Sequence, residues 1–484
     1  MAQPGLAHLN GVQGAGGSNP LSPTNFAKGE VGSESPAVAS SDSEPFLTLI
    51  EDKTMKTINI GIIGFGTVGC SVVKILQDRA ALLSKRCGVL VRIKYVCDVD
   101  TKSKRPVKLK GAVLAKDAYR VINDPDVDII VELIGGIHPA KEFIIAAMKK
   151  GKHIVTANKA LLAECGEEIF KTASAHGVDI YFEASAVAGV PIIKALREGF
   201  AGDKIEAVLG IVNGTCNFIL SRMTNDGVSF AEALKDAQAK GYAERNPSLD
   251  INGSDSAHKL VLLALLSFGE FVKLNDIYVE GITDISANDI AYANDFGYVI
   301  KLLAIAKESA GKLEVRVAPT LLPKDHLLAG VWGVYNAVLV MADMAGGVLF
   351  NGKGAGSFAA ASAVVSDIVD VARNINSGAV RRVPEYYKGQ SQISLRKISE
   401  IDSRYYIRFS VIDRPGVLAK ISGILGKHNI SIASVAQKER KLSKVVPVVI
   451  MTHEAKESSL RKALSEIDKL PVIKAKSVAI RVER

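Results

Sequence analysis

The sequence predicts an α/β protein with three folded parts: a domain of alternating strands and helices, an α+β middle domain, and a small C-terminal domain with a ferredoxin-like order of elements. Three observations carry this prediction. Short apolar runs alternate with longer helical-period segments from Ile58 to about Val190, and the end of the chain has a β, α, β, β, α, β pattern. The 484 residues also exceed what one ordinary core needs.

Composition narrows the class of protein. The chain is 48% hydrophobic and 23% charged, as globular proteins are, and it contains no apolar run suited to crossing a bilayer. Its net charge of +9 comes from basic residues mixed with acidic ones, which indicates a solvated surface and no basic arm for nucleic acid. The excess of positive charge could still attract anionic ligands. We therefore expect neither membrane nor nucleic-acid partners.

The five cysteines are an odd number, widely spaced and without a CxxC pair, which indicates neither a disulfide framework nor a zinc site. No secretory signal is visible at the N-terminus, so a reducing cytoplasm is the expected compartment. Residues 1–54 are rich in Gly, Ser, Pro and Ala, and we expect a disordered tail there. A Met-Lys-Thr triplet at 55–57 opens onto the first strand, which leaves open whether the tail belongs to the native protein.

The first domain, residues 55–190, has the pattern of a Rossmann-like dinucleotide-binding domain. Strands are expected at 58–64, 91–99, 127–135 and 153–158, with helices at 71–83 and 140–150. The first strand leads into GFGTVG, in which Gly64, Gly66 and Gly69 have GxGxxG spacing around Thr67 and Val68. Such glycines allow a tight turn, close approach of backbone to a pyrophosphate, and close packing of helix on strand.

The end of the second strand bears on the choice between NAD and NADP. Asp98 could accept hydrogen bonds from the adenosine ribose and would repel a 2′-phosphate, which favours NAD. Lys102, Lys104 and Arg105 follow closely, and basic side chains are what a 2′-phosphate needs. These three residues could equally belong to a solvated loop, so the choice of dinucleotide stays open.

The remainder of the chain divides into three parts. Residues 191–349 are expected to form the substrate and dimerisation domain, with helices at 230–241, 256–269 and 296–309 and strands at 204–212 and 313–322. The segment 350–377 is assigned to the first domain as a return segment. Residues 378–400 are polar and rich in Gly, Pro and Ser, which predicts a linker, and residues 401–484 form the C-terminal domain.

The segment 241–260 carries the strongest signal for chemistry. Glu244, Asp250, Asp255 and Lys259 fall within sixteen residues, the first two on a Gly- and Pro-broken loop. Asp255 and Lys259 stand at i and i+4 at the start of a helix, where they could form only a surface ion pair. The strongly apolar helix that follows indicates instead a buried element whose polar first turn faces a cleft.

A second lysine, Lys159, follows the end of a predicted parallel strand. Open α/β sheets bind ligands outside the carboxyl ends of such strands. An exposed lysine at a helix start is the alternative interpretation.

With these segments in order, the chain resembles the homoserine dehydrogenase family, in the single-function form with a C-terminal ACT domain, from about Met55 to the end. The resemblance rests on a series of motifs in one order. They are GFGTVG, ELIGG with His138-Pro139, TANK, FEASAVAGVPI, NGTCNFIL, GYAERNPSLDINGSDSAHKL, VEGITDI and KGAG.

The resemblance implies reversible, NAD(P)-dependent oxidation of L-homoserine to L-aspartate 4-semialdehyde, a step of threonine, methionine and isoleucine biosynthesis. It assigns proton transfer to Lys159 and Lys259 with Asp255 as their partner. A lysine suits this task only if its pKa falls, and burial beside a second cation would lower it. The implied substrate contacts are Glu244, Asp250, Gly214, Thr215 and Tyr242, and the implied cofactor contacts include Lys159, Gly354 and Gly356.

The resemblance also implies a monovalent cation, Na⁺ or K⁺, bound by main-chain carbonyls of Glu183, Ala186, Ala188 and Val190. A tight strand-to-helix turn is the alternative interpretation of that segment. Two positions depart from the family pattern: Ala188 replaces a usual glycine, and Ala359 with Ala360 replaces a Pro-Thr pair. The first makes the geometry of the cation loop less certain.

In the C-terminal domain, the resemblance implies an amino-acid effector site. The candidate contacts are Asp413, Gly416, Val417, Leu418 and Asn429. Threonine is the expected effector because it is an end product, and an ACT domain that only dimerises the protein is the alternative. We expect a homodimer or homotetramer. Two rival functions stay open: another Rossmann dehydrogenase with an amino-acid-like substrate, and a non-catalytic sensor of dinucleotide and effector.

Overall fold

The computed structural model describes residues 55–387, 393–437 and 445–483. The predicted tail, residues 1–54, therefore lies outside the described residues. Across the described part of the chain, no helix is long and apolar enough to cross a membrane. All five cysteines are free thiols, as their spacing predicted.

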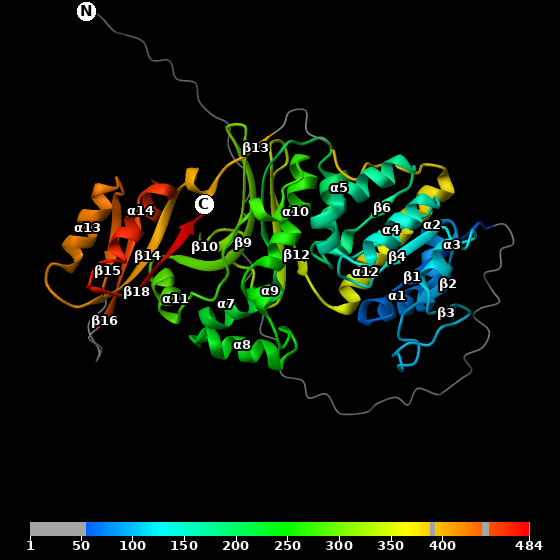
Figure 1. Cartoon of the computed structure of the whole chain (residues 1–484), viewed down its shortest axis with the longest axis horizontal. Helices are drawn as coiled ribbons and strands as arrows, with labels where there is room; N and C mark the ends of the chain where they lie inside the picture. The colour runs from blue at the N-terminus through cyan, green and yellow to red at the C-terminus, as the bar shows by residue number, and fades with distance from the viewer. Residues whose placement is uncertain (1–54, 388–392, 438–444, 484) are drawn as a thin grey trace, which may run out of the picture. The chain divides into compact units, whose positions relative to one another are not determined.

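A six-stranded parallel sheet forms the first domain (Figure 1), with strand order β3-β2-β1-β4-β5-β6. This is the doubly wound order, in which the chain reverses direction between β1 and β4 and leaves a crevice at the carboxyl ends of those strands. The Rossmann-like fold is confirmed. Its strands are β1 (Thr57–Ile63), β2 (Leu90–Cys97), β3 (Val113–Ala115), β4 (Ile129–Glu132), β5 (His153–Thr156) and β6 (Ile180–Tyr181).

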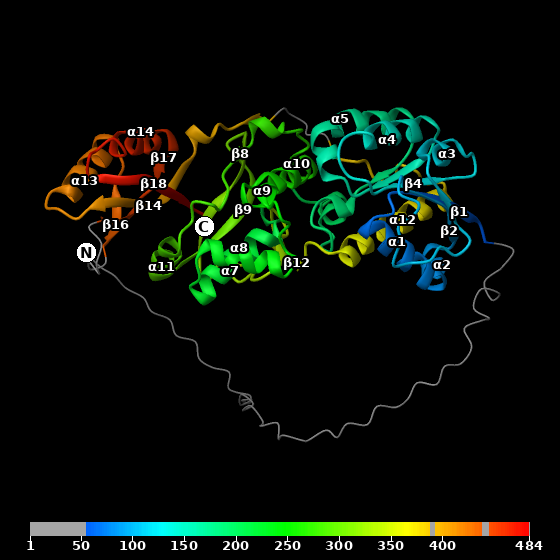
Figure 2. The same cartoon turned by 60° about the horizontal axis from the view of Figure 1, so that its bottom comes forward.

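Helices cover both faces of this sheet because its strands are apolar on both sides. On one face Ile60 and Ile62 pack in a core with α1 and with Ile368 of the distant helix α12. On the other face Ile63 and Ile130 pack against α3, α4 and α5 (Figure 2). The helices are α1 (Thr67–Asp78), α2 (Ala80–Cys87), α3 (Ala118–Asn123), α4 (Ala140–Lys149), α5 (Lys159–Ala175) and α12 (Ser357–Ser377).

The second sheet has the path β12-β11-β7-β9-β10-β18-β14-β16-β15 and begins in the middle of the chain. Its middle-domain strands are β7 (Ile205–Ile211), β8 (Tyr278–Val279), β9 (Tyr298–Ser309), β10 (Lys312–Pro323), β11 (Tyr335–Ala342), β12 (Gly346–Lys353) and β13 (Ser394–Leu395). The helices of this part are α6 (Ile192–Lys194), α7 (Gly214–Asp226), α8 (Phe230–Ala239), α9 (Ser248–Ile251), α10 (Ser254–Phe268) and α11 (Ala287–Asp295). Helix α10 is apolar on nearly all sides and is buried, as predicted.

One predicted helix is wrong. The segment 296–309 contains the central strand β9, which pairs with β7 on one side and β10 on the other. Its residues are buried in succession on both faces, so the sequence is a continuous apolar run without the alternation of a half-exposed strand. Such a run cannot be told from a buried helix by its periodicity alone.

The C-terminal domain has the predicted order of strands and helices, with the short β17 in addition. Its core includes Ile407 and Phe409 from the sheet and Leu460 from the helix layer. The elements are β14 (Asp402–Ile412), α13 (Val417–Lys427), β15 (Ile432–Ala436), β16 (Val445–Thr452), β17 (Ala455–Lys456), α14 (Glu457–Ile467) and β18 (Ile473–Val482).

The last strand joins this domain to the middle domain. In β18, Arg481 and Val482 pair in parallel with Thr320 and Leu321 of β10, which makes one continuous sheet of the two. The predicted linker, 378–400, also contributes a strand, because β13 pairs with β10. The C-terminal domain is therefore attached through hydrogen-bonded backbone as well as through the chain that leads into it.

Candidate active site

The glycine-rich turn after β1 has the geometry that a pyrophosphate requires. Gly64 has φ +109, and a Cβ there would lie 2.7 Å from the backbone of Leu133. A Cβ on Gly69 would overlap the carbonyl oxygen of Gly64. Gly66, the N-cap of α1, has open space where a Cβ would stand, and no side chain caps this helix. The free N–H groups at the start of α1, between Thr67 and Gly69, are thus available to an anion.

Asp98 holds this turn from the end of β2. Its Oδ2 accepts a 2.7 Å hydrogen bond from the backbone N of Phe65. The guanidinium of Arg105 lies 3.6 Å from Asp98 Oδ1 and 5.7 Å from the centre of the Phe65 ring. Lys102 and Lys104 are exposed. Of the three basic residues after Asp98, Arg105 is therefore the one held at the carboxylate.

Two lysines from different parts of the chain meet at one buried carboxylate. Lys159, the first residue of α5, lies with Nζ 2.9 Å from Asp255 Oδ1. Lys259, one turn after Asp255 on α10, donates a 2.8 Å hydrogen bond to Asp255 Oδ2. Lys259 also donates to the carbonyl oxygen of Val212 at 2.7 Å. The predicted helical spacing of Asp255 and Lys259 is correct, and this pair is buried, not exposed on the surface.

Asn213, which the sequence interpretation missed, ties the carboxylates together. Its Nδ2 donates to Asp250 Oδ1 at 2.8 Å and to Asp255 Oδ2 at 2.9 Å. Its Oδ1 accepts from the backbone N of Cys216, which caps the start of α7. An asparagine directly before a helical segment is a strong N-cap signal, and the NGTCNFIL motif contained it.

The two carboxyl groups differ in their electrostatics. Burial acts to raise the pKa of Asp255, but the two lysine ammonium groups outweigh it and hold the pKa well below its usual range. Burial and the nearby charge of Asp255 raise the pKa of Asp250, against the hydrogen bond from Asn213. Asp255 is therefore a fixed anion between two cations. A further cation beside Asp250 would stabilise the ionised form of Asp250.

The other predicted substrate residues differ in how close they lie to this cluster. The Thr215 hydroxyl donates to the carbonyl oxygen of Tyr242 at 2.7 Å. Gly214 lies so close to the loop before β11 that a Cβ would be 2.8 Å from the carbonyl oxygen of Val334. Glu244 lies on the exposed loop and, among the described residues, is not part of the hydrogen-bonded cluster. Asp250 was expected on a loop but lies in the one-turn helix α9.

A second missed residue, Glu132, organises the loop that carries Lys159. Glu132 ends β4 and is fully buried, and burial raises its pKa. Its carboxylate accepts from the Thr156 hydroxyl at 2.6 Å and from the backbone N of Ile134 at 2.9 Å. Asn158 caps α5 and donates to the Gly136 carbonyl oxygen at 2.6 Å. The ELIGG and TANK motifs therefore fix each other at the carboxyl edge of the sheet.

The proposed cation loop is a tight turn between β6 and α6. The Glu183 carboxylate accepts from the backbone N of Ile193 at 2.9 Å and of Lys194 at 2.8 Å, and burial raises its pKa to about 7. The carbonyl of Val190 accepts from the backbone N of Ile192. Ala188 is not among the non-glycine residues with positive φ, so an alanine there causes no backbone strain.

The predicted effector residues lie at both ends of one helix. Gly416 is the N-cap of α13, and it is followed by the buried Val417 and the half-exposed Leu418. Asn429 follows the C-terminal end of α13 and has a positive φ of 59. With 11 residues, α13 is ~16 Å long. Asp413 and Asn429 are therefore separated by the length of this helix within one chain.

Comparison with known proteins agrees with this architecture. Family models match the chain in three segments: the homoserine dehydrogenase NAD-binding domain at 64–183, homoserine dehydrogenase at 191–369, and the ACT domain at 405–472. The homoserine dehydrogenase of Neisseria gonorrhoeae is 43% identical over 89% of this chain and 99% of its own length. That of Bacillus subtilis is 40% identical over the same shares.

Solved structures lead to the same family. The homoserine dehydrogenase of Thiobacillus denitrificans matches with a TM-score of 0.82 and 40% identity, over 89% of this chain and 99% of that one. A hyperthermophilic archaeal homoserine dehydrogenase in complex with NADPH matches with a TM-score of 0.56 and 27% identity, over 65% of this chain and 97% of that one.

The Rossmann-like sheet, the glycine turn and the two lysines at Asp255 define an oxidoreductase that uses a nicotinamide dinucleotide. Within that class, the chain belongs to the homoserine dehydrogenase family, with a C-terminal ACT domain.

Proposed function

We propose that this chain oxidises L-homoserine reversibly to L-aspartate 4-semialdehyde, with Lys159 and Lys259 in the path of the hydroxyl proton and Asp255 as their positioning partner. The observation that carries the proposal is the Asp255 carboxylate, which binds one lysine through each oxygen. Two ammonium groups are thereby held side by side near the carboxyl edge of the sheet.

The chemistry needs such a pair. A bound nicotinamide dinucleotide supplies the acceptor for the hydride that leaves the alcohol carbon. The hydroxyl proton would pass to one of the two lysines in its amine form, and the ammonium of the other would stabilise the alkoxide character that develops. A lysine ammonium has three donor hydrogens, and Lys259 uses two of them on Val212 and Asp255. The third is left for the substrate oxygen.

Asp250 would bind the substrate ammonium. It is half-buried near Asp255 and its pKa is raised, so a cation next to it would favour its ionised form. The Thr215 to Tyr242 hydrogen bond and the close approach at Gly214 support a formed pocket wall on the adjacent turn. Glu244 would join this pocket only if the exposed loop 241–247 closes over the substrate.

The experiment follows nicotinamide absorbance with L-homoserine and either NAD⁺ or NADP⁺. We expect turnover with L-homoserine and at least a hundred-fold lower kcat/KM with L-serine, whose chain is one methylene shorter and would hold the alcohol away from the lysines. Comparable turnover of another amino alcohol would favour a different dehydrogenase. Dinucleotide binding without turnover of any alcohol would favour a sensor.

The contacts around Asp98 support use of both dinucleotides. Asp98 suits the ribose hydroxyls of NAD, while Arg105 beside it could pair with a 2′-phosphate. We propose that Arg105 sets the relative affinity. Arg105→Ala is expected to lower kcat/KM for NADP⁺ about ten-fold more than for NAD⁺. Equal effects on the two would remove Arg105 from phosphate recognition.

A monovalent cation at the turn formed by residues 183–190 is part of the proposal. Across the described residues, no cluster of three His, Cys, Asp or Glu side chains could hold a metal, so the cation would depend on main-chain carbonyls. The closeness of Gly189 to the Lys353 carbonyl links this turn to the segment before Gly354. We expect KCl or NaCl, but not choline chloride, to raise Tm and kcat. Equal effects of all three salts would contradict a specific site.

We further propose that an amino acid, threonine by pathway logic, binds the C-terminal domain and changes activity. A site that combines Asp413 with Asn429 requires two copies of the chain, because α13 separates these residues within one copy. This supports a homodimer or homotetramer. Analytical ultracentrifugation with and without threonine tests the assembly, and a monomer in both conditions would contradict the combined site.

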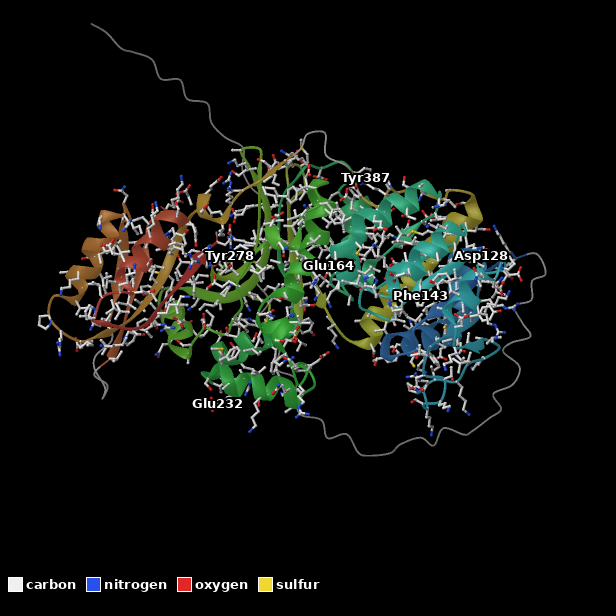
Figure 3. The ribbon with its side chains drawn as sticks, in the orientation of Figure 1. Asp128, Phe143, Glu164, Glu232, Tyr278 and Tyr387 are labelled. Atoms are coloured by element: carbon white, nitrogen blue, oxygen red, sulfur yellow. The ribbon has the colours of Figure 1, made fainter. Side chains whose placement is uncertain are left out.

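A chain of contacts supports coupling between that domain and the substrate pocket. Arg461 donates to the Tyr278 hydroxyl at 2.9 Å, and this hydroxyl donates to Glu280 at 2.8 Å. Tyr278, labelled in Figure 3, belongs to β8, which pairs with β10. Three residues further on, Gly281 packs against the backbone of Ile251, the residue after Asp250.

Tyr278→Phe tests this route because it removes the hydroxyl and leaves the ring. We expect kcat without effector to stay unchanged and the response to threonine to weaken several-fold. The matched control is Tyr119→Phe, a ring in the first domain that packs edge-on against Phe143. An unchanged threonine response in Tyr278→Phe would exclude the hydroxyl from the coupling.

A further inference from the structure

Asn336, at the start of β11, carries a buried acceptor that no group in the described part of the chain satisfies. Its side chain is 1% exposed, and among the described residues its Oδ1 has no hydrogen-bond partner. Buried amide oxygens are normally paired, because an unpaired one loses its hydration without compensation. An orphaned acceptor of this kind indicates that its partner comes from a ligand.

The position of Asn336 identifies which ligands are within reach. A Cβ on Gly354 would overlap the side-chain amide of Asn336, and a Cβ on Gly214 would lie 3.1 Å from its Oδ1. Gly354 belongs to the segment assigned to the cofactor, and Gly214 to the turn assigned to the substrate. The amide therefore separates these two segments and touches the backbone of both.

The same turn connects Asn336 to the reacting groups. Val212 accepts from Lys259, Asn213 donates to Asp250 and Asp255, and Gly214 packs on Asn336. Three consecutive residues thus contact the catalytic lysine, the paired carboxylates and the orphaned amide.

We propose that Asn336 is a ligand-binding residue whose Oδ1 accepts a hydrogen bond from a donor group bound next to Gly214 and Gly354. The donor chemistry has two sources in the proposed reaction on which this inference rests: the carboxamide NH₂ of the nicotinamide, and the ammonium or hydroxyl of the amino-alcohol substrate. In either case the hydrogen bond fixes the position of the ligand relative to Lys259.

The test is Asn336→Leu, which is close to asparagine in shape and has no polar atoms. Since Oδ1 is unpaired in the free protein, the Tm of the ligand-free variant should be unchanged or higher. The affinity for one ligand should fall about ten-fold or more. The readouts are Kd for NADH or NADPH by fluorescence, KM for L-homoserine, and Tm without ligand.

Asn217→Leu is the matched control. Asn217 is equally buried, but its Nδ2 donates to the carbonyls of Val331 and Tyr335, so its replacement should lower Tm and leave both affinities within two-fold. A ten-fold loss in Kd for dinucleotide assigns Oδ1 to the carboxamide, and a ten-fold rise in KM alone assigns it to the substrate.

If Asn336→Leu keeps both its affinity for dinucleotide and its KM for L-homoserine, the inference is overturned. A fall in Tm like that of Asn217→Leu would also overturn it and would make Asn336 a structural residue. The proposed function is tested separately by wild-type turnover of L-homoserine. If that turnover were absent, the Kd values of Asn336→Leu for reduced dinucleotide and for L-homoserine would still decide the role of the amide.

Discussion

The Nζ of Lys159, at the start of α5, lies 2.9 Å from Oδ1 of Asp255, at the start of α10. This contact joins the domain of the Rossmann-like sheet to the middle domain. The other oxygen of Asp255 binds Lys259. One carboxylate therefore fixes the relative position of two ammonium groups that come from different parts of the fold.

Replacing Asp255 by asparagine tests this positioning role. Asp255→Asn keeps the size of the side chain and removes the charge that holds both lysines, so we expect kcat to fall at least a hundred-fold. Steady-state kinetics with L-homoserine measures the effect. Asp78→Asn is the control, because Asp78 pairs with Lys74 on an exposed helix face and should leave kcat unchanged. A wild-type kcat in Asp255→Asn would show that the Asp255 charge is not needed to position the two lysines.

Glu183 makes stability depend on pH. Its pKa is about 7 in the folded chain because of burial, against an ordinary value of 4.5, and Lys194 and Arg197 offset the burial only in part. The unfolded chain releases this proton from about pH 4.5, whereas the folded chain keeps it to about pH 7. The wild-type free energy of unfolding should therefore fall relative to Glu183→Gln as pH rises through this window.

The expected relative change is at most about 3 kcal/mol, and it should level off above about pH 7. Chemical denaturation of the two proteins at about pH 5 and about pH 8 measures it. The same difference in stability at both pH values would show that Glu183 is not protonated in the folded protein. The neighbouring Asp367, whose pKa is raised by burial and by the charge of Glu183, titrates together with Glu183, so the comparison reports on this pair of carboxyl groups.

The junction between the C-terminal and middle domains contains a buried ion pair. Arg481 and Glu457 are each 1% exposed and lie 2.7 Å apart. Removing one partner leaves a buried charge, so Arg481→Met should lower the free energy of unfolding by about 3–5 kcal/mol. Adding Glu457→Gln should restore part of this loss. Chemical denaturation of the full chain measures both, and additive losses in the double variant would contradict coupling of the pair.

Removing the chain after residue 391 should leave homoserine turnover and abolish the amino-acid response, because the whole catalytic cluster precedes this point. The structure adds an expected cost in stability. Arg316, which is buried, loses its 2.6 Å contact with Glu483, and β10 loses its pairing with β18. We expect a lower Tm for the truncated protein. A retained response to threonine would mean that the effector site lies elsewhere.

The sequence predicted the elements whose pattern is local. The GxGxxG turn, the i and i+4 pair of Asp255 and Lys259, and the order of the C-terminal strands were all correct, since each depends on spacing within a short segment. The strand β9 was missed because a strand buried on both faces has no distinguishing period.

The sequence predicted fewer features of the candidate site than of the fold. Asn213 stands at a recognisable N-cap position, but its contacts with Asp250 and Asp255 depend on partners far along the chain, as does the contact of Glu132 with Thr156. No sequence motif marks Asn336, because the two glycines that pack against its side chain come from separate segments of the chain. The pairing of β18 with β10 is likewise a tertiary contact. The linker predicted at 378–400 gave no indication that the two domains would share a sheet.

The central claim is that Lys159 and Lys259 carry the proton of the alcohol. The most direct test is kcat with L-homoserine in Lys159→Ala and in Lys259→Ala, measured beside the Kd for reduced dinucleotide and with Lys74→Ala as an exposed control. The account predicts a fall in kcat of about 10²-fold or more in each, with dinucleotide affinity kept within a few-fold. Near-normal kcat in either variant would contradict the assignment of that lysine to the proton path.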